Sequence, residues 1–119
     1  RALKLQKRAA QVGFDWPDAQ PVLDKLAEEL DEVRAEFDAG SQADSARIED
    51  EIGDMLFVLV NLTRHADVDF SRALRRANAK FERRFRGMEA LASAAGGTLD
   101  GQSLGEQEAL WNQVKRDGL

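Results

Sequence analysis

The chain has 119 residues, of which 43% are hydrophobic and 33% charged, and its formal net charge is −5. This balance suits a single helical domain over residues 1–119 and excludes a disordered chain. The acidic net charge argues against binding to nucleic-acid polymers, the lack of cysteine excludes disulfides and thiolate metal sites, and no apolar run approaches the roughly 20 residues of a membrane span. Cytoplasmic is the default expectation, and the start at Arg1 rather than Met predicts a fragment or a processed chain.

Hydrophobic periodicity predicts helices, and no strand pattern of any length occurs. The first helix is predicted over residues 3–12, and a turn-rich break with Phe14 and Trp16 follows it. Pro21 fits the first turn of the second helix, where its missing donor does no harm. That helix extends to about residue 37, because its apolar residues recur every three or four positions: Leu23, Leu26, Leu30, Val33 and Phe37.

A polar loop over residues 38–44, with Gly40-Ser41-Gln42 as its break, precedes the third helix. Asp44 or Ser45 is the expected N-cap, and the helix extends to about His65. After Asp54 it is apolar nearly all round, which is typical of a central bundle helix or a subunit interface. Since a chain of this size has few helices to cover both sides, we infer a homodimer. Gly53, a poor helix former, favours tight helix packing at its position.

Asp69 is expected to cap a fourth helix, which ends at residues 95–97. Its predicted core face consists of Phe70, Leu74, Ala77, Phe81, Phe85 and Met88. A last short helix is predicted from Leu104 to about Lys115. The fold class is therefore all-α.

Acidic residues cluster on the second and third helices. Glu29 and Glu32 share one flank of the second helix's apolar stripe, and Glu51 and Asp54 share one flank of the third. Like charges at this spacing repel, so a hard divalent cation between them is the natural partner. His65 lies about three turns beyond Asp54, which leaves all-oxygen ligation and favours Mg²⁺ or Mn²⁺ over zinc or iron. The alternative is a pair of solvated acidic faces, the commoner fate of Glu-rich helices.

Basic residues dominate from Arg64 to Arg86. Lys80 and Arg84 flank the Phe81/Phe85 stripe, with Asn78 near its other edge, and such bases could hold phosphate oxygens. Lys25 precedes Glu29 by one turn, and Trp111 and Lys115 place an aromatic ring one turn from a cation. The alternatives are surface ion pairs for the bases and core packing for Trp111. Phe14 and Trp16 carry the same ambiguity.

The acidic motifs Glu28-Glu29-Leu30-Asp31-Glu32 and Glu51-Ile52-Gly53-Asp54 resemble the E-E-x-x-E and E-x-x-D pattern of the MazG-type, all-α nucleoside triphosphate pyrophosphohydrolases. Three further stretches are similar to that family: residues 5–16, 78–85 and 111–115. Together they make the resemblance specific. It is closest to the C-terminal of the two MazG domains in the longer bacterial proteins.

The resemblance implies a four-helix-bundle-type MazG fold assembled as a homodimer. It also implies hydrolysis of a nucleoside triphosphate to the monophosphate and pyrophosphate with Mg²⁺, with Mn²⁺ as the alternative. Carried over by position, the metal ligands would be Glu29, Glu32, Glu51 and Asp54, and Glu29 or Glu32 would take the proton of the attacking water. The substrate-binding residues would be Lys25, Asn78, Lys80, Arg84, Trp111 and Lys115.

Two other functions remain open from the sequence. The domain could bind nucleotide or metal within a larger protein without turnover, or it could be a purely structural dimerisation bundle. The intact acidic motifs count against the first alternative. The second explains the apolar third helix but not four acids at the edges of apolar stripes. The preferred base and sugar do not follow from the sequence.

Overall fold

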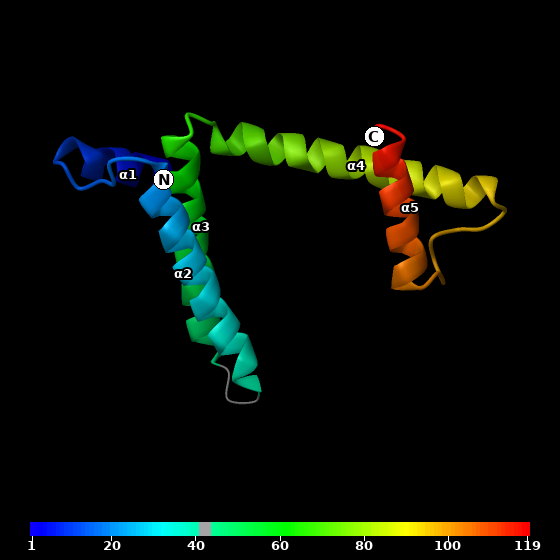
Figure 1. The fold of residues 1–119 in the computed structure, drawn as a ribbon, viewed down its shortest axis with the longest axis horizontal. Helices are drawn as coiled ribbons and strands as arrows, with labels where there is room; N and C mark the ends of the chain where they lie inside the picture. Colours follow the sequence, from blue (N-terminus) through cyan, green and yellow to red (C-terminus); the bar gives the residue numbers. More distant parts are fainter. Residues whose placement is uncertain (41–43) are drawn as a thin grey trace. The chain divides into compact units, whose positions relative to one another are not determined.

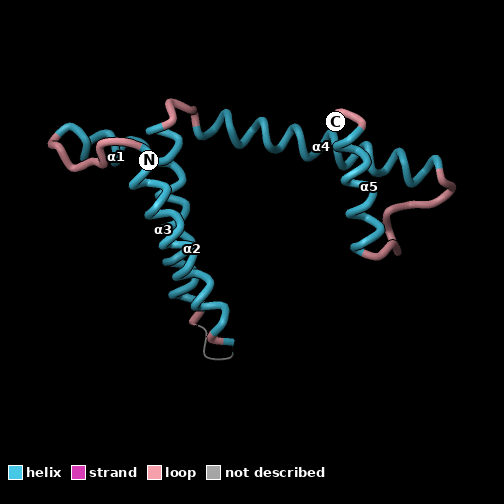
Figure 2. Tube along the Cα trace, in the orientation of Figure 1, coloured by secondary structure: helices cyan, strands magenta, loops and turns pink. Residues whose placement is uncertain are grey.

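Residues 1–40 and 44–119 are described by a computed structural model of the chain, and every regular element among them is a helix (Figures 1 and 2). The all-α fold class is confirmed. The helices fall into two compact units, Arg1–Phe70 and Ser71–Leu119. Ser41 and Gln42 of the predicted break lie outside the described residues. None of the helices in the described ranges is long and apolar enough to cross a bilayer.

The first unit contains α1 (Ala2–Gln11), α2 (Ala19–Asp38) and α3 (Ser45–His65), close to the predicted boundaries. Two aspartates start the long helices, because their side chains accept hydrogen bonds from the first unpaired backbone N–H groups. Asp18 accepts from the Gln20 amide at 3.0 Å, and Asp44 accepts from the Ala46 amide at 2.9 Å. Pro21 lies in the first turn of α2, as predicted.

Helices α2 and α3 lie side by side along their length (Figure 1). From Val22 onward, the α2 residues that are not exposed lie along one side of the helix, and they are Val22, Lys25, Leu26, Glu29, Val33 and Glu36. This face is rotated from the predicted stripe, since Leu23, Leu30 and Phe37 remain 44%, 44% and 61% exposed. The rotation carries Glu29 into the contact between the two helices.

The third helix is also covered on one side only. Val58 and Asn61 are buried, whereas Ile52 and Leu56 are 40% and 52% exposed. A Cβ added at Gly53 would meet no atom within 4 Å in the described residues. The tight packing predicted at Gly53 is therefore not found among the described residues, because neither α1 nor α2 covers that side of α3.

Helix α1 packs on α3. Its buried side is made of small residues around one polar residue, Gln6, which is 6% exposed. The Gln6 Nε2 atom donates a hydrogen bond of 2.8 Å to the backbone oxygen of Phe57. A hydrogen bond from a buried side-chain amide thus connects α1 to α3.

The second unit contains most of α4 (Phe70–Ala94) and α5 (Leu104–Arg116). A Cβ added at Gly87 would lie 3.2 Å from both methyl groups of Val114, so the glycine permits the close approach of α5. Val114, Met88 and Ala92 are buried at this crossing. Because α5 is short, it covers only part of the predicted face of α4. Leu74, Phe81 and Phe85 remain 52%, 57% and 40% exposed.

Candidate functional site

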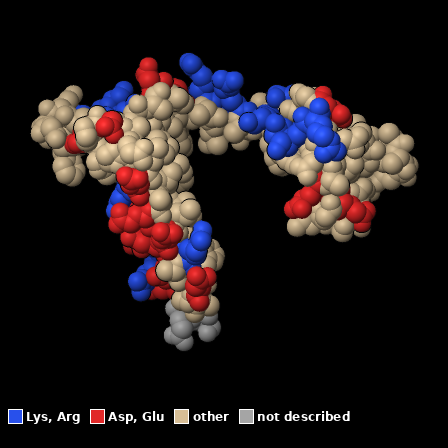
Figure 3. All heavy atoms as spheres, in the orientation of Figure 1, with Lys and Arg blue, Asp and Glu red and all other residues tan. Residues whose placement is uncertain are grey.

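Three carboxylates converge where α2 faces α3. Glu29 on α2 and Glu51 and Asp54 on α3 each offer an oxygen, and these oxygens lie within 4.8 Å of one another. Their convergence follows from local structure, because Glu51 and Asp54 are one turn apart and Glu29 sits in the row of α2 that packs on α3. Figure 3 shows that Asp and Glu side chains gather along the α2–α3 hairpin.

Glu29 is the most buried member of the cluster, at 5% exposure. Its Oε1 lies 3.3 Å from the Lys25 ammonium, while its Oε2 is buried without a hydrogen-bond partner among the described residues. An unpartnered buried carboxylate oxygen is costly, so this position favours a bound cation. The bond with Glu29, and then the charge of Glu28 at 3.6 Å, raise the pKa of Lys25.

Glu32 adjoins the cluster from the next turn of α2. A hydrogen bond with Glu51 raises the pKa of Glu32, and loss of hydration raises it further, whereas Glu29 and Lys25 oppose the shift. A carboxyl group whose pKa is raised by a second carboxylate marks a concentration of negative charge. A divalent cation placed there would neutralise part of that charge.

The four acids therefore form a set that could hold a divalent metal ion. Hard cations such as Mg²⁺, Mn²⁺ and Ca²⁺ take carboxylate oxygens, and no nitrogen or sulfur ligand from the described residues belongs to this cluster. Glu28, the first acid of the motif, is 61% exposed at its side chain and pairs with Lys25. It lies outside the three-carboxylate cluster.

The other residues predicted to bind substrate lie in the second unit. The Arg84 guanidinium lies 5.4 Å from the centre of the Trp111 ring, and its Nε donates to the backbone oxygen of Leu119 at 3.1 Å. Phe81 packs on the same Trp111 ring, with centres 5.7 Å apart. Lys80 lines a hollow on α4, and Asn78 and Lys115 are exposed. The structure thus brings Arg84 and Trp111 together as a cation on an aromatic face.

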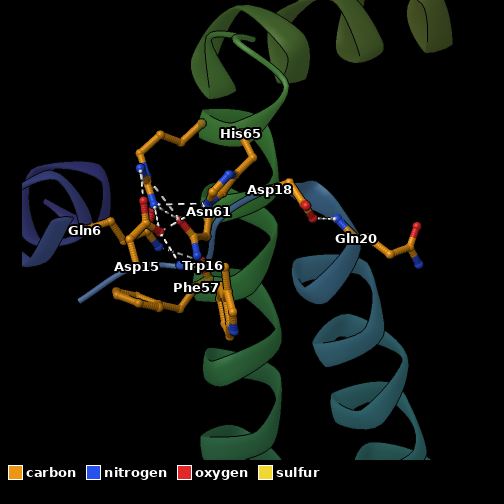
Figure 4. A network of polar contacts seen from close by, with 9 residues as sticks. Gln6, Asp15, Trp16, Asp18, Gln20, Phe57, Asn61 and His65 are labelled. Carbon is orange, nitrogen blue, oxygen red and sulfur yellow. Dashed lines mark hydrogen bonds and ion pairs between the residues drawn. The ribbon is translucent and has the colours of Figure 1, made fainter. Parts of the chain in front are cut away.

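A polar network at the end of α3 was missed by the sequence analysis (Figure 4). Both terminal nitrogens of Arg64 donate hydrogen bonds to the carboxylate oxygens of Asp15, at 3.0 and 2.5 Å. Arg64 also donates to the Oδ1 atom of Asn61. The Nε2 atom of His65 lies 3.2 Å from the same carboxylate. The Arg64 bonds lower the pKa of Asp15 to about 2. The network fixes the segment between α1 and α2 to α3.

A cavity of about 360 Å³ opens beside this network. Its lining comes from α1, from the segment between α1 and α2, and from α3. Figure 4 shows Gln6, Trp16 and Phe57 around this region. The only sequence signal for the cavity was the pair Phe14 and Trp16 in a predicted loop, where large aromatic residues have no helix face to fill.

Comparison with known proteins gives a consistent result. The family model described as the MazG nucleotide pyrophosphohydrolase domain matches residues 18–87. A protein of Escherichia coli named nucleoside triphosphate pyrophosphohydrolase is 49% identical over all 119 residues, which cover 45% of its length. One of Thermotoga maritima, named nucleoside triphosphate pyrophosphohydrolase/pyrophosphatase MazG, is 39% identical over 114 residues, or 96% of this chain and 42% of its own length. The chain thus spans less than half of these relatives.

Proposed function

The chain belongs to the MazG family of nucleotide pyrophosphohydrolases, and we propose that it hydrolyses nucleoside triphosphates to nucleoside monophosphate and pyrophosphate with Mg²⁺. The observation that carries this proposal is the convergence of Glu29, Glu51 and Asp54 within 4.8 Å, with Glu32 beside them. The names of the two relatives support the same reaction. Mn²⁺ is the alternative ion, since it prefers the same oxygen ligands.

In this proposal Glu29, Glu32, Glu51 and Asp54 hold the metal. When bound, the ion would neutralise charge on the triphosphate and lower the pKa of a water molecule. Glu32, or Glu29, accepts the proton of the water that attacks the α-phosphorus, and pyrophosphate leaves. Glu51 and the loss of hydration raise the pKa of Glu32, and the negative charge that this marks is the charge a metal ion would neutralise.

We also propose the substrate contacts that the sequence predicts. Lys25, Lys80, Arg84 and Lys115 contact phosphate oxygens, and Trp111 lies against the nucleotide with Asn78 nearby. The contact between Arg84 and Trp111 supports the proposal that these two side chains bind the same substrate molecule. We further propose that residues 1–119 form a single domain, which the family match supports by running from α2 into α4.

We also propose a homodimer built as a four-helix bundle. Its support is the exposed apolar surface of α3, where Ile52, Leu56 and Phe57 are 40%, 52% and 44% exposed. Apolar side chains grouped in this way mark an interaction surface. Since the proposed substrates are nucleotides of the cell interior, we assign the activity to the cytoplasm.

The test is pyrophosphate release from a panel of ribo- and deoxynucleoside triphosphates, with Mg²⁺ and with EDTA. We expect EDTA-sensitive release and a monophosphate co-product. Glu32→Gln and Asp54→Asn each remove one ligand charge, so we expect kcat to fall by at least ~100-fold. The control is Glu49→Gln, an exposed acid on the side of α3 away from Glu51, which should keep full activity.

Two outcomes would contradict the proposal. Full activity in both ligand variants would exclude the metal site as assigned. Tight metal-dependent binding of every nucleotide without any product would favour a binding module, the alternative that the sequence left open.

A further inference from the structure

A row of bases without acidic partners follows one side of α4, in the second unit. This basic row consists of Arg76, Lys80 and Arg83, which are exposed and succeed one another at steps of four and three residues. None of the three has an ion-pair or hydrogen-bond partner among the described residues, whereas Arg86 pairs with Glu82 at 2.6 Å. Figure 3 shows Lys and Arg side chains gathered over α4. Like charges one turn apart repel, and a bound anion would relieve that repulsion.

The basic row surrounds a hollow on α4. The volume of the hollow is about 480 Å³, and the rest of its lining is small, namely Ala73, Ala77 and Ala79. Short side chains between long ones leave room for a ligand against the helix. No acidic residue from the described ranges lines the hollow, so its polar side chains are donors only. Two guanidinium forks and an ammonium group suit phosphate oxygens.

The basic row leads to the pair formed by Arg84 and Trp111. Arg84 follows Lys80 by one turn of α4, and its guanidinium lies 5.4 Å from the centre of the Trp111 ring. Arg76 precedes Arg84 by eight residues, which is about 12 Å along the helix axis. This side of the second unit therefore has an aromatic end at Trp111 and a cationic end at Arg76. A nucleoside triphosphate has the same polarity, with rings at one end and the highest charge at the other.

We propose that Arg76 and Arg83 are further substrate-binding residues and that Arg76 binds the terminal phosphoryl group of the nucleoside triphosphate. The inference rests on the proposed function, in which Trp111 lies against the nucleotide and Lys80 contacts phosphate oxygens. Arg76 lies farthest from Trp111, so it reaches the third phosphoryl group and not the second. Arg83 lies beside Lys80 and contacts the phosphoryl groups that diphosphates and triphosphates share. The basic row thus distinguishes nucleotides by the length of the phosphate chain.

The first test measures the binding of ATP and ADP to the full chain by calorimetry, in EDTA so that no hydrolysis occurs. We expect Arg76→Gln to raise the Kd of ATP about tenfold, the effect of one charge-assisted hydrogen bond, and to leave the Kd of ADP unchanged. Arg83→Gln should raise both Kd values by a similar factor. The control is Arg75→Gln, which removes the same charge from an exposed position of α4 outside the hollow and should change neither value.

Three results of this test would overturn the proposal. The first is an unmodified chain that binds ATP no more tightly than ADP. The second is an equal rise in the Kd of ATP for Arg75→Gln and Arg76→Gln, which would mean that only the net charge of α4 matters. The third is an Arg76→Gln variant in which the Kd of ADP rises as much as that of ATP, because Arg76 would then not contact the terminal phosphoryl group.

The second test uses pyrophosphate release from ATP with Mg²⁺. Arg76→Gln should raise KM about tenfold at similar kcat, because its contact with the terminal phosphoryl group is made in the bound substrate and kept during the reaction. An unchanged KM would overturn the assignment of Arg76. The predicted pattern of ATP and ADP binding in a chain that releases no pyrophosphate would support the basic row and contradict the proposed hydrolysis alone.

Discussion

At the scale of single residues, Glu29 occupies a position where an apolar side chain would pack better. It lies in the α2 row formed with Val22 and Val33, both of which are buried. Burial of a carboxylate with one unpartnered oxygen costs free energy, and the Lys25 ammonium at 3.3 Å offsets only part of it. The proposed metal site would explain this residue, because a cation bound at Glu29, Glu51 and Asp54 would offset the cost of burying the carboxylate.

Asp15 makes the pH dependence of stability testable. Its pKa is lowered from 3.8 to about 2 by Arg64 and, to a lesser degree, by His65. A lowered pKa means that the ion pair stabilises the fold fully above pH 3.8 and that this contribution is lost as the pH falls through about 2. We expect Asp15→Asn to be less stable than the unmodified chain at pH 5, and the difference to shrink between pH 4 and pH 2.

The measurement is the urea midpoint of unfolding across that pH range. Asp31→Asn, an exposed aspartate on α2, is the matched control and should follow the unmodified chain at every pH. A difference between Asp15→Asn and the unmodified chain that stays constant from pH 5 to pH 2 would mean that Asp15 contributes through shape and not through charge.

At the scale of helices, the ends were predictable and the packed faces were not. Asp44 and the Pro21 turn are local signals, since caps and proline act on their own backbone within one turn, and both predictions were confirmed. The stripe of α2 was predicted from hydrophobicity alone, which favours Leu23 and Leu30. Both are 44% exposed, because the position of α3 decides which row is covered.

The final helix offers a test of local stability. The Ser103 side chain accepts a hydrogen bond of 3.1 Å from the Glu106 amide, and the Glu106 carboxylate accepts from the Ser103 amide at 3.4 Å. Loss of such a cap costs about 1 kcal/mol. We expect Ser103→Ala to lower the free energy of opening of the α5 amides by that amount, measured by hydrogen exchange. Ser93→Ala, at an exposed position inside α4, should change α5 by less than about 0.5 kcal/mol.

At the scale of the molecule, the sequence predicted more of the carboxylate cluster than of the cavity beside the Asp15 network. Acids at a step of three fall on one face of a helix whatever the tertiary fold, so Glu51 and Asp54 could be paired in advance. Their approach to Glu29 required only that α2 and α3 form a hairpin. The cavity instead depends on how α1 and the Asp15 segment dock on α3. No periodicity in the sequence encodes that docking.

The exposed apolar face of α3 allows a test of the proposed homodimer. Leu56 is 52% exposed between Ile52 and Phe57, and a charge buried there without a partner would oppose association. We expect the unmodified chain to sediment as a dimer and Leu56→Asp to raise the dimer dissociation constant by at least ~10-fold, an effect of about 1.4 kcal/mol. Leu104→Asp is the matched control, because Leu104 is 70% exposed at the start of α5, where an acid suits the helix N-terminus. A monomeric unmodified chain, or equal dissociation constants for both variants, would show that this face does not form the interface.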